Sequence, residues 1–147
     1  WNVAERTGHP QIVELYRYYA TLRMKLISYL ALCARESSVT GAPGMRPLQF
    51  AYPDDAACWK IDDEYLLGGD ILVAPVLHRG LREREVYLPE GDWTDGWSGE
   101  STAGPRSMRA PAPLEVLPLF VRSGASRELE GIFPLTAPHF ASESGRR

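Results

Sequence analysis

Residues 71–77 read Ile71-Leu72-Val73-Ala74-Pro75-Val76-Leu77 and follow directly on Gly68-Gly69-Asp70. An uninterrupted apolar run of this length, preceded by turn residues, is typical of a buried strand. Shorter strand-like runs follow at residues 85–88, 93–97 and 114–121, with Gly, Pro and Asp between them. This spacing predicts an antiparallel β-sandwich over residues 70–125, and Pro118 predicts that the last run is an edge strand or contains a bulge.

Upstream of this run, apolar residues recur every three or four positions over residues 12–37. This periodicity predicts one long amphipathic helix, which Gly41 ends. Residues 45–52 then predict a short strand. Residues 54–67 predict a second helix that is capped by a carboxylate and ended by Gly68.

The order helix, strand, helix, and then many strands predicts two units. A lone strand between two helices has both edges unpaired, and strands flanked by helices in this way build β/α barrels. We therefore expect residues 1–69 to be the C-terminal end of a (β/α)8 barrel and residues 70–125 to be an appended β-sandwich domain. Residues 126–147 lose this patterning and are expected to form an irregular tail. Because residue 1 is Trp and not Met, we also expect further sequence before it.

The composition excludes several classes of protein. The chain has 16 Lys plus Arg against 19 Asp plus Glu and a net charge of −3, without a basic block, so nucleic acid is not an expected partner. No stretch approaches the about 18 apolar residues of a membrane span. The two cysteines, Cys33 and Cys58, suit free thiols in a reducing compartment, and we expect a cytoplasmic protein. No His or Cys spacing predicts a metal site.

Carboxylates are the most plentiful reactive groups, which invites comparison with glycosidases. A retaining mechanism needs two carboxyl groups about 5–5.5 Å apart. Asp54 and Asp55 are adjacent, so in an extended segment their side chains point to opposite faces. We interpret this pair as a helix start whose carboxylate accepts backbone N–H groups, and Asp62, Asp63 and Glu64 as the polar face of the second helix.

Two tryptophans suggest a different use of the β region. Trp93 and Trp97 are four residues apart in a strand-like segment, so both are expected on one face together with Asp95, where they could stack a sugar ring. The interpretation that we favour is that both indoles fill the core or pack against the preceding unit. Arg46 lies in a mainly apolar strand, and we interpret it as one partner of a structural ion pair.

Several short segments resemble, in order and spacing, the C-terminal part of glycoside hydrolase family 31. They are residues 44–48, 52–55, 65–68, 71–77, 86–95 and 118–124. The similarity extends from about residue 1 to residue 124, and the sequence departs from the family's pattern after that point. The matching residues are those that close the barrel and seat the sandwich on it, and they include Arg46, Pro47, Pro53, Asp54, Asp55, Gly68, Asp70 and Pro75.

The resemblance implies a retaining α-glycosidase, usually an α-glucosidase or an α-xylosidase, that needs no metal or organic cofactor. The family's nucleophile and acid/base are two aspartates on earlier barrel strands, in segments that do not occur in this sequence. No catalytic residue is therefore assigned. The implied partners are the N-terminal part of the barrel and, through the complete enzyme, a carbohydrate substrate. The alternative hypothesis is a non-catalytic carbohydrate-binding β module that uses Trp93 and Trp97.

Overall fold

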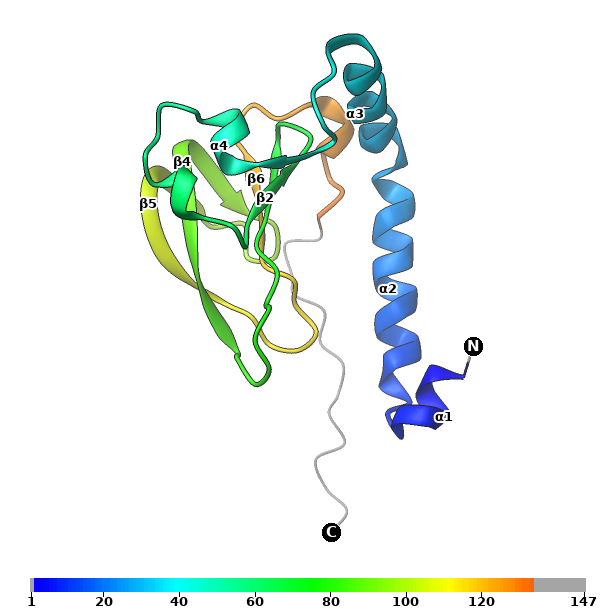
Figure 1. Ribbon diagram of the computed structural model, residues 1–147. Coiled ribbons are helices and arrows are strands. Elements are labelled where there is room, and N and C mark those ends of the chain that lie inside the picture. The colour runs from blue at the N-terminus through cyan, green and yellow to red at the C-terminus, as the bar shows by residue number, and fades with distance from the viewer. Residues whose placement is uncertain (1, 134–147) are drawn as a thin grey trace.

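One six-stranded antiparallel sheet, in the strand order β1-β2-β3-β6-β4-β5, organises the protein (Figure 1). The structure is a computed structural model, and it describes residues 2–133. Every pair of neighbouring strands in this sheet is antiparallel. The strands are β1 (Met45–Pro47), β2 (Tyr65–Leu67), β3 (Ile71–Val73), β4 (Glu83–Asp95), β5 (Ser101–Pro111) and β6 (Leu119–Arg122).

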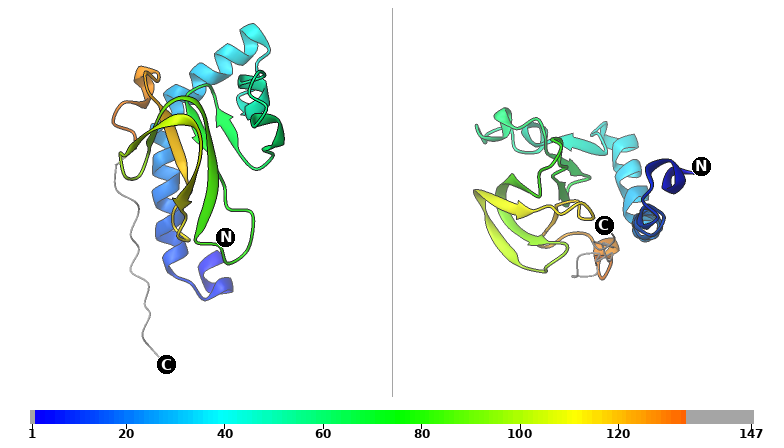
Figure 2. Two further views of the ribbon diagram at one scale, coloured as in Figure 1. Left: turned by 90° about the vertical axis from the view of Figure 1, so that its left-hand side faces the viewer. Right: turned by 90° about the horizontal axis from the view of Figure 1, so that it is seen from below.

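Helices precede the sheet and cover one of its faces (Figure 2). Two longer helices, α2 and α3, run along this face, and short helical turns lie between the strands or after them. The helical elements are α1 (Val3–Thr7), α2 (Gln11–Lys25), α3 (Ile27–Thr40), α4 (Leu48–Ala51), the 3₁₀ turn η1 (Cys58–Lys60) and the 3₁₀ turn η2 (Arg127–Leu129).

Alternation along the strands divides the apolar side chains between two clusters. On the helix-facing side, Ile71, Val73 and Leu119 pack with residues of α2 and α3. On the other side, Leu72 and Phe120 belong to a second cluster, which the curled β4–β5 ribbon and α4 complete. Successive side chains of a strand point to opposite faces, so the short β3 contributes to both clusters.

The curl of the sheet comes from β4. Its register against β5 shifts between Leu88 and Gly91, as expected for a β-bulge. Beyond this shift, Trp93 and Thr94 pair with both β5 and β6. The bulge therefore lets one continuous strand replace the two strand-like runs predicted at residues 85–88 and 93–97.

The single helix predicted over residues 12–37 is two helices. Leu26 separates them with φ −77° and ψ −3°, and its N–H approaches the carbonyls of both Leu22 and Arg23 at 3.1 Å. This 3₁₀-like turn changes the direction of the chain between α2 and α3 (Figure 2). Neither Gly nor Pro marks the break, which is why the periodicity runs through it.

The second helix predicted over residues 54–67 is wrong. The chain there makes a turn, the 3₁₀ turn η1, and then the strand β2, which pairs with β1 on one side and β3 on the other. Leu66 is buried on the side opposite to Tyr65 and Leu67. The alternation of apolar side chains in a three-residue strand is too short to be recognised, and the spacing of Ile61, Tyr65 and Leu66 is typical of a helix.

Three other expectations about the β region need correction. The strand predicted over residues 45–52 ends at Pro47, and α4 follows. The strand β5 was not predicted, because most of its side chains are exposed and few are apolar. The strand β6 lies inside the sheet between β3 and β4 and is not an edge strand. Pro118 comes just before β6, where its carbonyl accepts the N–H of Ala74 at 3.0 Å.

The sheet also crosses the predicted domain boundary between residues 69 and 70, because β2 pairs with β3. Downstream of residue 125, the described residues contain η2 and three buried apolar side chains, Leu129, Ile132 and Phe133. These eight residues are therefore not the irregular tail that the sequence predicted. The rest of that prediction, residues 134–147, lies outside the described residues.

Candidate functional site

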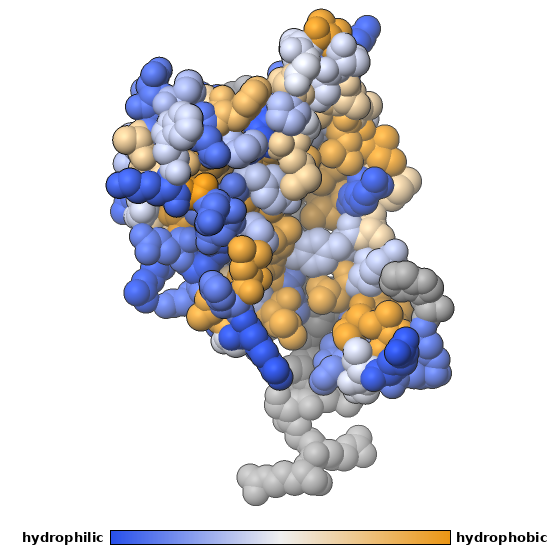
Figure 3. Space-filling view, viewed as in Figure 1, coloured by the Kyte–Doolittle hydropathy of each residue, from blue (hydrophilic) through white to orange (hydrophobic). Residues whose placement is uncertain are grey.

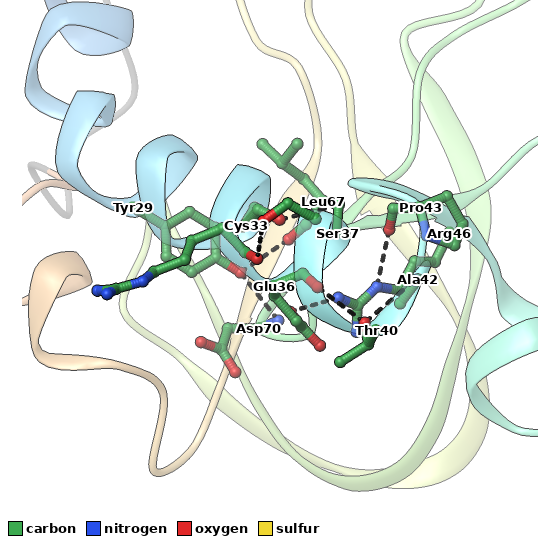
Figure 4. Close-up of polar contacts among 12 residues, drawn as sticks. Tyr29, Cys33, Glu36, Ser37, Thr40, Ala42, Pro43, Arg46, Leu67 and Asp70 are labelled. Carbon is green, nitrogen blue, oxygen red and sulfur yellow. Dashed lines mark hydrogen bonds and ion pairs between the residues drawn. The ribbon is translucent and has the colours of Figure 1, made fainter.

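The junction between α3 and the β2–β3 hairpin centres on the hydroxyl of Tyr29 (Figure 4). This side chain is 2% exposed. Its hydroxyl donates to the carbonyl of Leu67 at 2.8 Å and accepts the N–H of Asp70 at 3.1 Å. Burial raises the pKa of Tyr29 well above its ordinary value of 10, so the hydroxyl keeps its proton and remains a donor.

Gly68 lies directly under this tyrosine, at the turn between β2 and β3. Its φ is +63°, and a Cβ there would overlap the Tyr29 hydroxyl and the Cys33 sulfur. Only glycine combines this backbone conformation with the close approach of α3. Asp70 follows in the same turn, and its carboxylate accepts the N–H of Ser126 at 3.1 Å. The two predicted motif residues, Gly68 and Asp70, thus hold three segments together.

Arg46 on β1 forms the ion pair that the sequence predicted. Its guanidinium contacts the carboxylate of Glu36 on α3 and donates to the carbonyl of Pro43 at 2.9 Å (Figure 4). The side chain of Arg46 is 11% exposed and that of Glu36 is 45% exposed. Pro47 ends β1 opposite Tyr65. This pair therefore ties the end of α3 to the first strand of the sheet.

The Pro-Asp-Asp segment is a turn that reaches across to β4. The carbonyl of Pro53 accepts the indole N–H of Trp59 at 2.8 Å. Asp55 accepts the N–H of Ala57 at 2.9 Å with one oxygen and the Tyr87 hydroxyl at 2.6 Å with the other. The hydrogen bond from Tyr87 lowers the pKa of Asp55. Asp55 therefore does accept a backbone N–H, in a turn before η1 and not at the start of an α-helix.

Asp54, by contrast, is exposed. The neighbouring carboxylates thus have different environments, in line with the expectation that adjacent side chains diverge. In this arrangement Asp55 acts as an acceptor that fixes β4. No shared site is formed by the pair.

The sequence does not predict the buried contact between the side chains of Glu64 and Arg84. The guanidinium of Arg84 contacts the carboxylate of Glu64 at 3.1 Å and that of Asp63 at 3.0 Å, and it also donates to the carbonyl of Pro75. Glu64 is therefore not part of an exposed helix face. One signal in the sequence could have indicated this contact. Arg84 alternates with Val86 along the strand and so lies on the same buried face, where a guanidinium requires a carboxylate partner.

Trp93 and Trp97 are both buried, with exposed fractions of 0% and 5%. The indole N–H of Trp93 donates to the carbonyl of Pro89 at 2.9 Å, and that of Trp97 donates to the carbonyl of Leu117 at 2.7 Å. Neither ring presents an open face on which a sugar could stack in this structure. The interpretation as core residues accounts for both side chains.

The two indoles also lie in different apolar clusters, so the prediction of a common face is wrong. The reason is that β4 ends at Asp95, whose carboxylate accepts the N–H of Trp97 at 2.7 Å and turns the chain. Trp97 then packs against the rings of Tyr18 and Tyr19 on α2, with centroids 6.4 and 6.1 Å away. This contact fixes α2 on the sheet.

The Tyr19 hydroxyl strengthens the same contact. It donates to the carbonyl of Glu115 at 2.7 Å and accepts the N–H of Leu117 at 3.1 Å. Like the Tyr29 hydroxyl, it forms hydrogen bonds with two backbone groups of the β region and so joins a helix to that region. Both tyrosines belong to the periodic pattern of residues 12–37, but that pattern gives no sign of their hydroxyl partners.

No cofactor site emerges from the part of the chain that the structure describes. Within residues 2–133, no three His, Cys, Asp or Glu side chains are grouped so that they could hold a metal ion. No helix among those residues has both the length and the apolar character of a membrane span. Cys33 and Cys58 are buried free thiols. The polar groups described above instead join helices to strands and strands to one another.

A sequence model of the glycosyl hydrolase family 31 C-terminal domain matches residues 41–125. The chain belongs to glycoside hydrolase family 31. Among characterised relatives, this family 31 chain is 40% identical over 133 residues to a 1,3-alpha-isomaltosidase of Kribbella flavida, which covers 90% of the chain and 18% of the relative. It is 37% identical over 125 residues to an isomaltosyltransferase of Sporosarcina globispora, which covers 85% of the chain and 11% of the relative.

Solved structures agree with this assignment. A family 31 alpha-xylosidase from a soil metagenome superimposes with a TM-score of 0.75 at 43% identity, over 77% of this chain and 17% of that one. The cycloalternan-degrading enzyme of Trueperella pyogenes gives a TM-score of 0.81 at 36% identity, over 86% of this chain and 18% of that one. The family 31 chain thus spans less than a fifth of the length of each of these four relatives.

Proposed function

We propose that this chain is the C-terminal part of a retaining α-glycosidase, in which it closes and braces the catalytic barrel and supplies the proximal β domain. The relatives' names and the family match support an enzyme that acts on α-glycosidic bonds of carbohydrates. The two catalytic aspartates expected for such an enzyme have no counterpart among these residues. The role of the chain is then to hold the barrel in shape.

The observation that carries this proposal is the exposed apolar face of α2 and α3. The inner face of these helices packs on the sheet. On their outer side, five large apolar residues have exposed fractions between 45% and 79%: Val13, Tyr16, Met24, Ile27 and Val39. Figure 3 shows apolar surface on the helix side of the molecule. Large apolar side chains that are exposed along a helix mark a surface suited to contact with a further layer of protein.

The preceding part of the same enzyme is the cover that we propose for this face. The isomaltosyltransferase and the 1,3-alpha-isomaltosidase are much longer than the segment matched here, which covers 11% and 18% of their lengths. Barrel helices pack against neighbouring helices and strands of the barrel, which bury such a face. The exposed Met45 of β1 is consistent with a strand that also has a neighbour there.

An activity assay tests the proposal. The isolated chain is incubated with aryl α-glucosides and aryl α-xylosides, next to the complete protein that carries it. We expect no turnover by the isolated chain and hydrolysis with retention by the complete protein. Hydrolysis by the isolated chain alone would contradict the proposal, because it would place the catalytic groups among these residues.

Sugar binding by the isolated chain is the matching control. Calorimetric titration with gluco- and xylo-oligosaccharides is expected to give no heat of binding, since both candidate indoles are buried. Binding that is lost in the Trp97→Ala variant would favour the alternative hypothesis of a carbohydrate-binding β module.

A further inference from the structure

Glu64 lies at the joint where the start of β2 meets β4, and only one of its carboxylate oxygens is satisfied. Its side chain is 3% exposed. Oε1 accepts hydrogen bonds from Arg84 at 3.1 Å and from the N–H of Tyr87 at 3.0 Å. Oε2 is buried and has no hydrogen-bond partner among residues 2–133. A fully ionised carboxylate is a costly occupant of such a position.

Arg84 is shared between two carboxylates. Its guanidinium contacts Glu64 and, at 3.0 Å, the carboxylate of Asp63, whose side chain is 44% exposed. It also donates to the backbone carbonyls of Asp63 and Pro75. The guanidinium is therefore held in place by backbone groups and by Asp63, whatever the charge on Glu64.

The charge balance of the cluster depends on one proton. With both carboxylates ionised, Glu64, Asp63 and Arg84 carry a net charge of −1 at a largely buried joint. Burial raises the pKa of Glu64 from its ordinary value of 4.5 to about 7, and the charge of Asp63 acts in the same direction. The N–H of Tyr87 and the guanidinium of Arg84 act in the opposite direction.

The other titratable groups nearby are accounted for. Cys58 on η1 feels the charge of Glu64, but burial raises its pKa to about 12, so it stays a thiol. The Tyr87 hydroxyl is bonded to Asp55 and keeps its proton. The surface beside Asp63 and Arg84 also carries charged or titratable side chains from the β3–β4 connection and from the β4–β5 ribbon, namely His78, Glu83, Glu85 and Arg109.

We propose that Glu64, Arg84 and Asp63 form a proton-linked clamp. In the closed clamp the buried Glu64 carboxyl is protonated while Arg84 pairs with Asp63. Loss of that proton places a charge on a carboxylate whose buried Oε2 has no hydrogen-bond partner among residues 2–133, and so weakens the joint between β2 and β4. The clamp is a property of the sheet and does not depend on the proposed glycosidase activity.

Urea unfolding of the 147-residue chain across pH 5 to 8 tests the clamp, with Glu64→Gln as the comparison. Glutamine keeps an acceptor for Arg84 and Tyr87 but carries no charge. Native Glu64 keeps a proton that the unfolded chain releases, so increasing pH favours unfolding. As the pH rises from 5 toward 7, the unfolding constant of the wild type divided by that of Glu64→Gln should increase by up to about tenfold per pH unit. A ratio that is constant across this range would overturn the proposal.

A titration of the folded wild type keeps the test independent of variant stability. The ¹³C resonance of the Glu64 carboxyl is followed from pH 4 to pH 8, and we expect it to titrate near neutral pH. In Asp63→Asn the same resonance should titrate at lower pH, because a like charge is removed. In His78→Gln it should not move. Titration of Glu64 below about pH 5 in the wild type, or no shift in Asp63→Asn, would overturn the clamp.

Discussion

At the scale of single residues, two hydroxyls fasten the helices to the sheet, and each serves two backbone groups. Tyr19 bonds the segment before β6, and Tyr29 bonds the β2–β3 turn. A buried hydroxyl that satisfies both a carbonyl and an N–H leaves two unpaired groups when it is removed. These side chains are therefore more sensitive to truncation than their apolar contacts suggest.

Replacing Tyr29 by Phe tests this. We expect a loss of about 1–3 kcal/mol in the free energy of unfolding, because the carbonyl of Leu67 and the N–H of Asp70 lose their partner. Urea unfolding monitored by tryptophan fluorescence measures the change. Tyr16→Phe is the control, since that side chain is 71% exposed, and its effect should stay within about 0.5 kcal/mol. Equal effects of the two substitutions would disprove the role of the Tyr29 hydroxyl.

Gly68 gives a second prediction at this scale. An alanine there would combine strain at a φ of +63° with overlap on Tyr29 and Cys33, so Gly68→Ala should destabilise the fold by clearly more than the about 1 kcal/mol that positive φ alone costs. Gly124→Ala is the matched control, because Gly124 has a φ of +76° and open space around it. The ratio of the two losses, measured by urea unfolding, separates overlap from strain.

The hydrogen bond from Tyr87 to Asp55 predicts a dependence on acid pH. Because this bond lowers the pKa of Asp55 in the folded state, its contribution is present above the carboxyl's ordinary value of 3.8 and is lost as the pH falls through the folded value. Tyr87→Phe should therefore be less stable than the wild type by about 1 kcal/mol at pH 6, and the difference should shrink as the pH falls through the folded-state pKa of Asp55, which lies below 3.8. A difference that is independent of pH would argue against the bond.

At the scale of elements, the sequence predicted long and strongly patterned segments better than short ones. The helical region before Gly41 is confirmed, and the apolar strand predicted over residues 71–77 is confirmed at its first three residues, Ile71–Val73. Long periodic or continuous apolar segments give the strongest local signal. The three-residue strand β2 and the polar strand β5 were missed. Their place in the sheet depends on pairing with distant neighbours, and local sequence carries little trace of such pairing.

The same distinction applies to the candidate site. Arg46 could be interpreted correctly, because a charge in an apolar strand demands a partner. The sequence gives no sign of the partner of Arg84, because its pattern predicts Glu64 on a helix that the structure does not contain. Gly68 was recognised as a motif residue, but the reason for it, contact with Tyr29 and Cys33, needed the three-dimensional arrangement.

Residues after 125 give a prediction at the scale of elements. Leu129 is 5% exposed and packs in the helix-facing cluster, although the family match ends at residue 125. Leu129→Ala should destabilise the chain by about 2–4 kcal/mol, because it leaves a cavity between η2 and α3. Leu114→Ala, at a position that is 73% exposed, should change stability by less than about 0.5 kcal/mol. Thermal unfolding of both variants checks the difference.

At the scale of the whole molecule, the two faces of α2 and α3 have different partners in our proposal. The inner face binds the sheet through apolar contacts and tyrosine hydroxyls. The outer face is exposed here, and we propose that the preceding part of the enzyme covers it. An isolated chain with such a face should bind a hydrophobic dye strongly.

A Met24→Glu substitution, made both in the isolated chain and in the complete protein, tests whether the outer face of α2 is covered. Met24 is 62% exposed on the outer face of α2. In the complete protein, we expect Met24→Glu to lower Tm by several degrees because it buries a charge, and Met24→Leu to leave Tm unchanged. Neither variant should alter the free energy of unfolding of the isolated chain by more than about 0.5 kcal/mol. An equally small effect of Met24→Glu in both proteins would show that the preceding part of the enzyme does not cover this face.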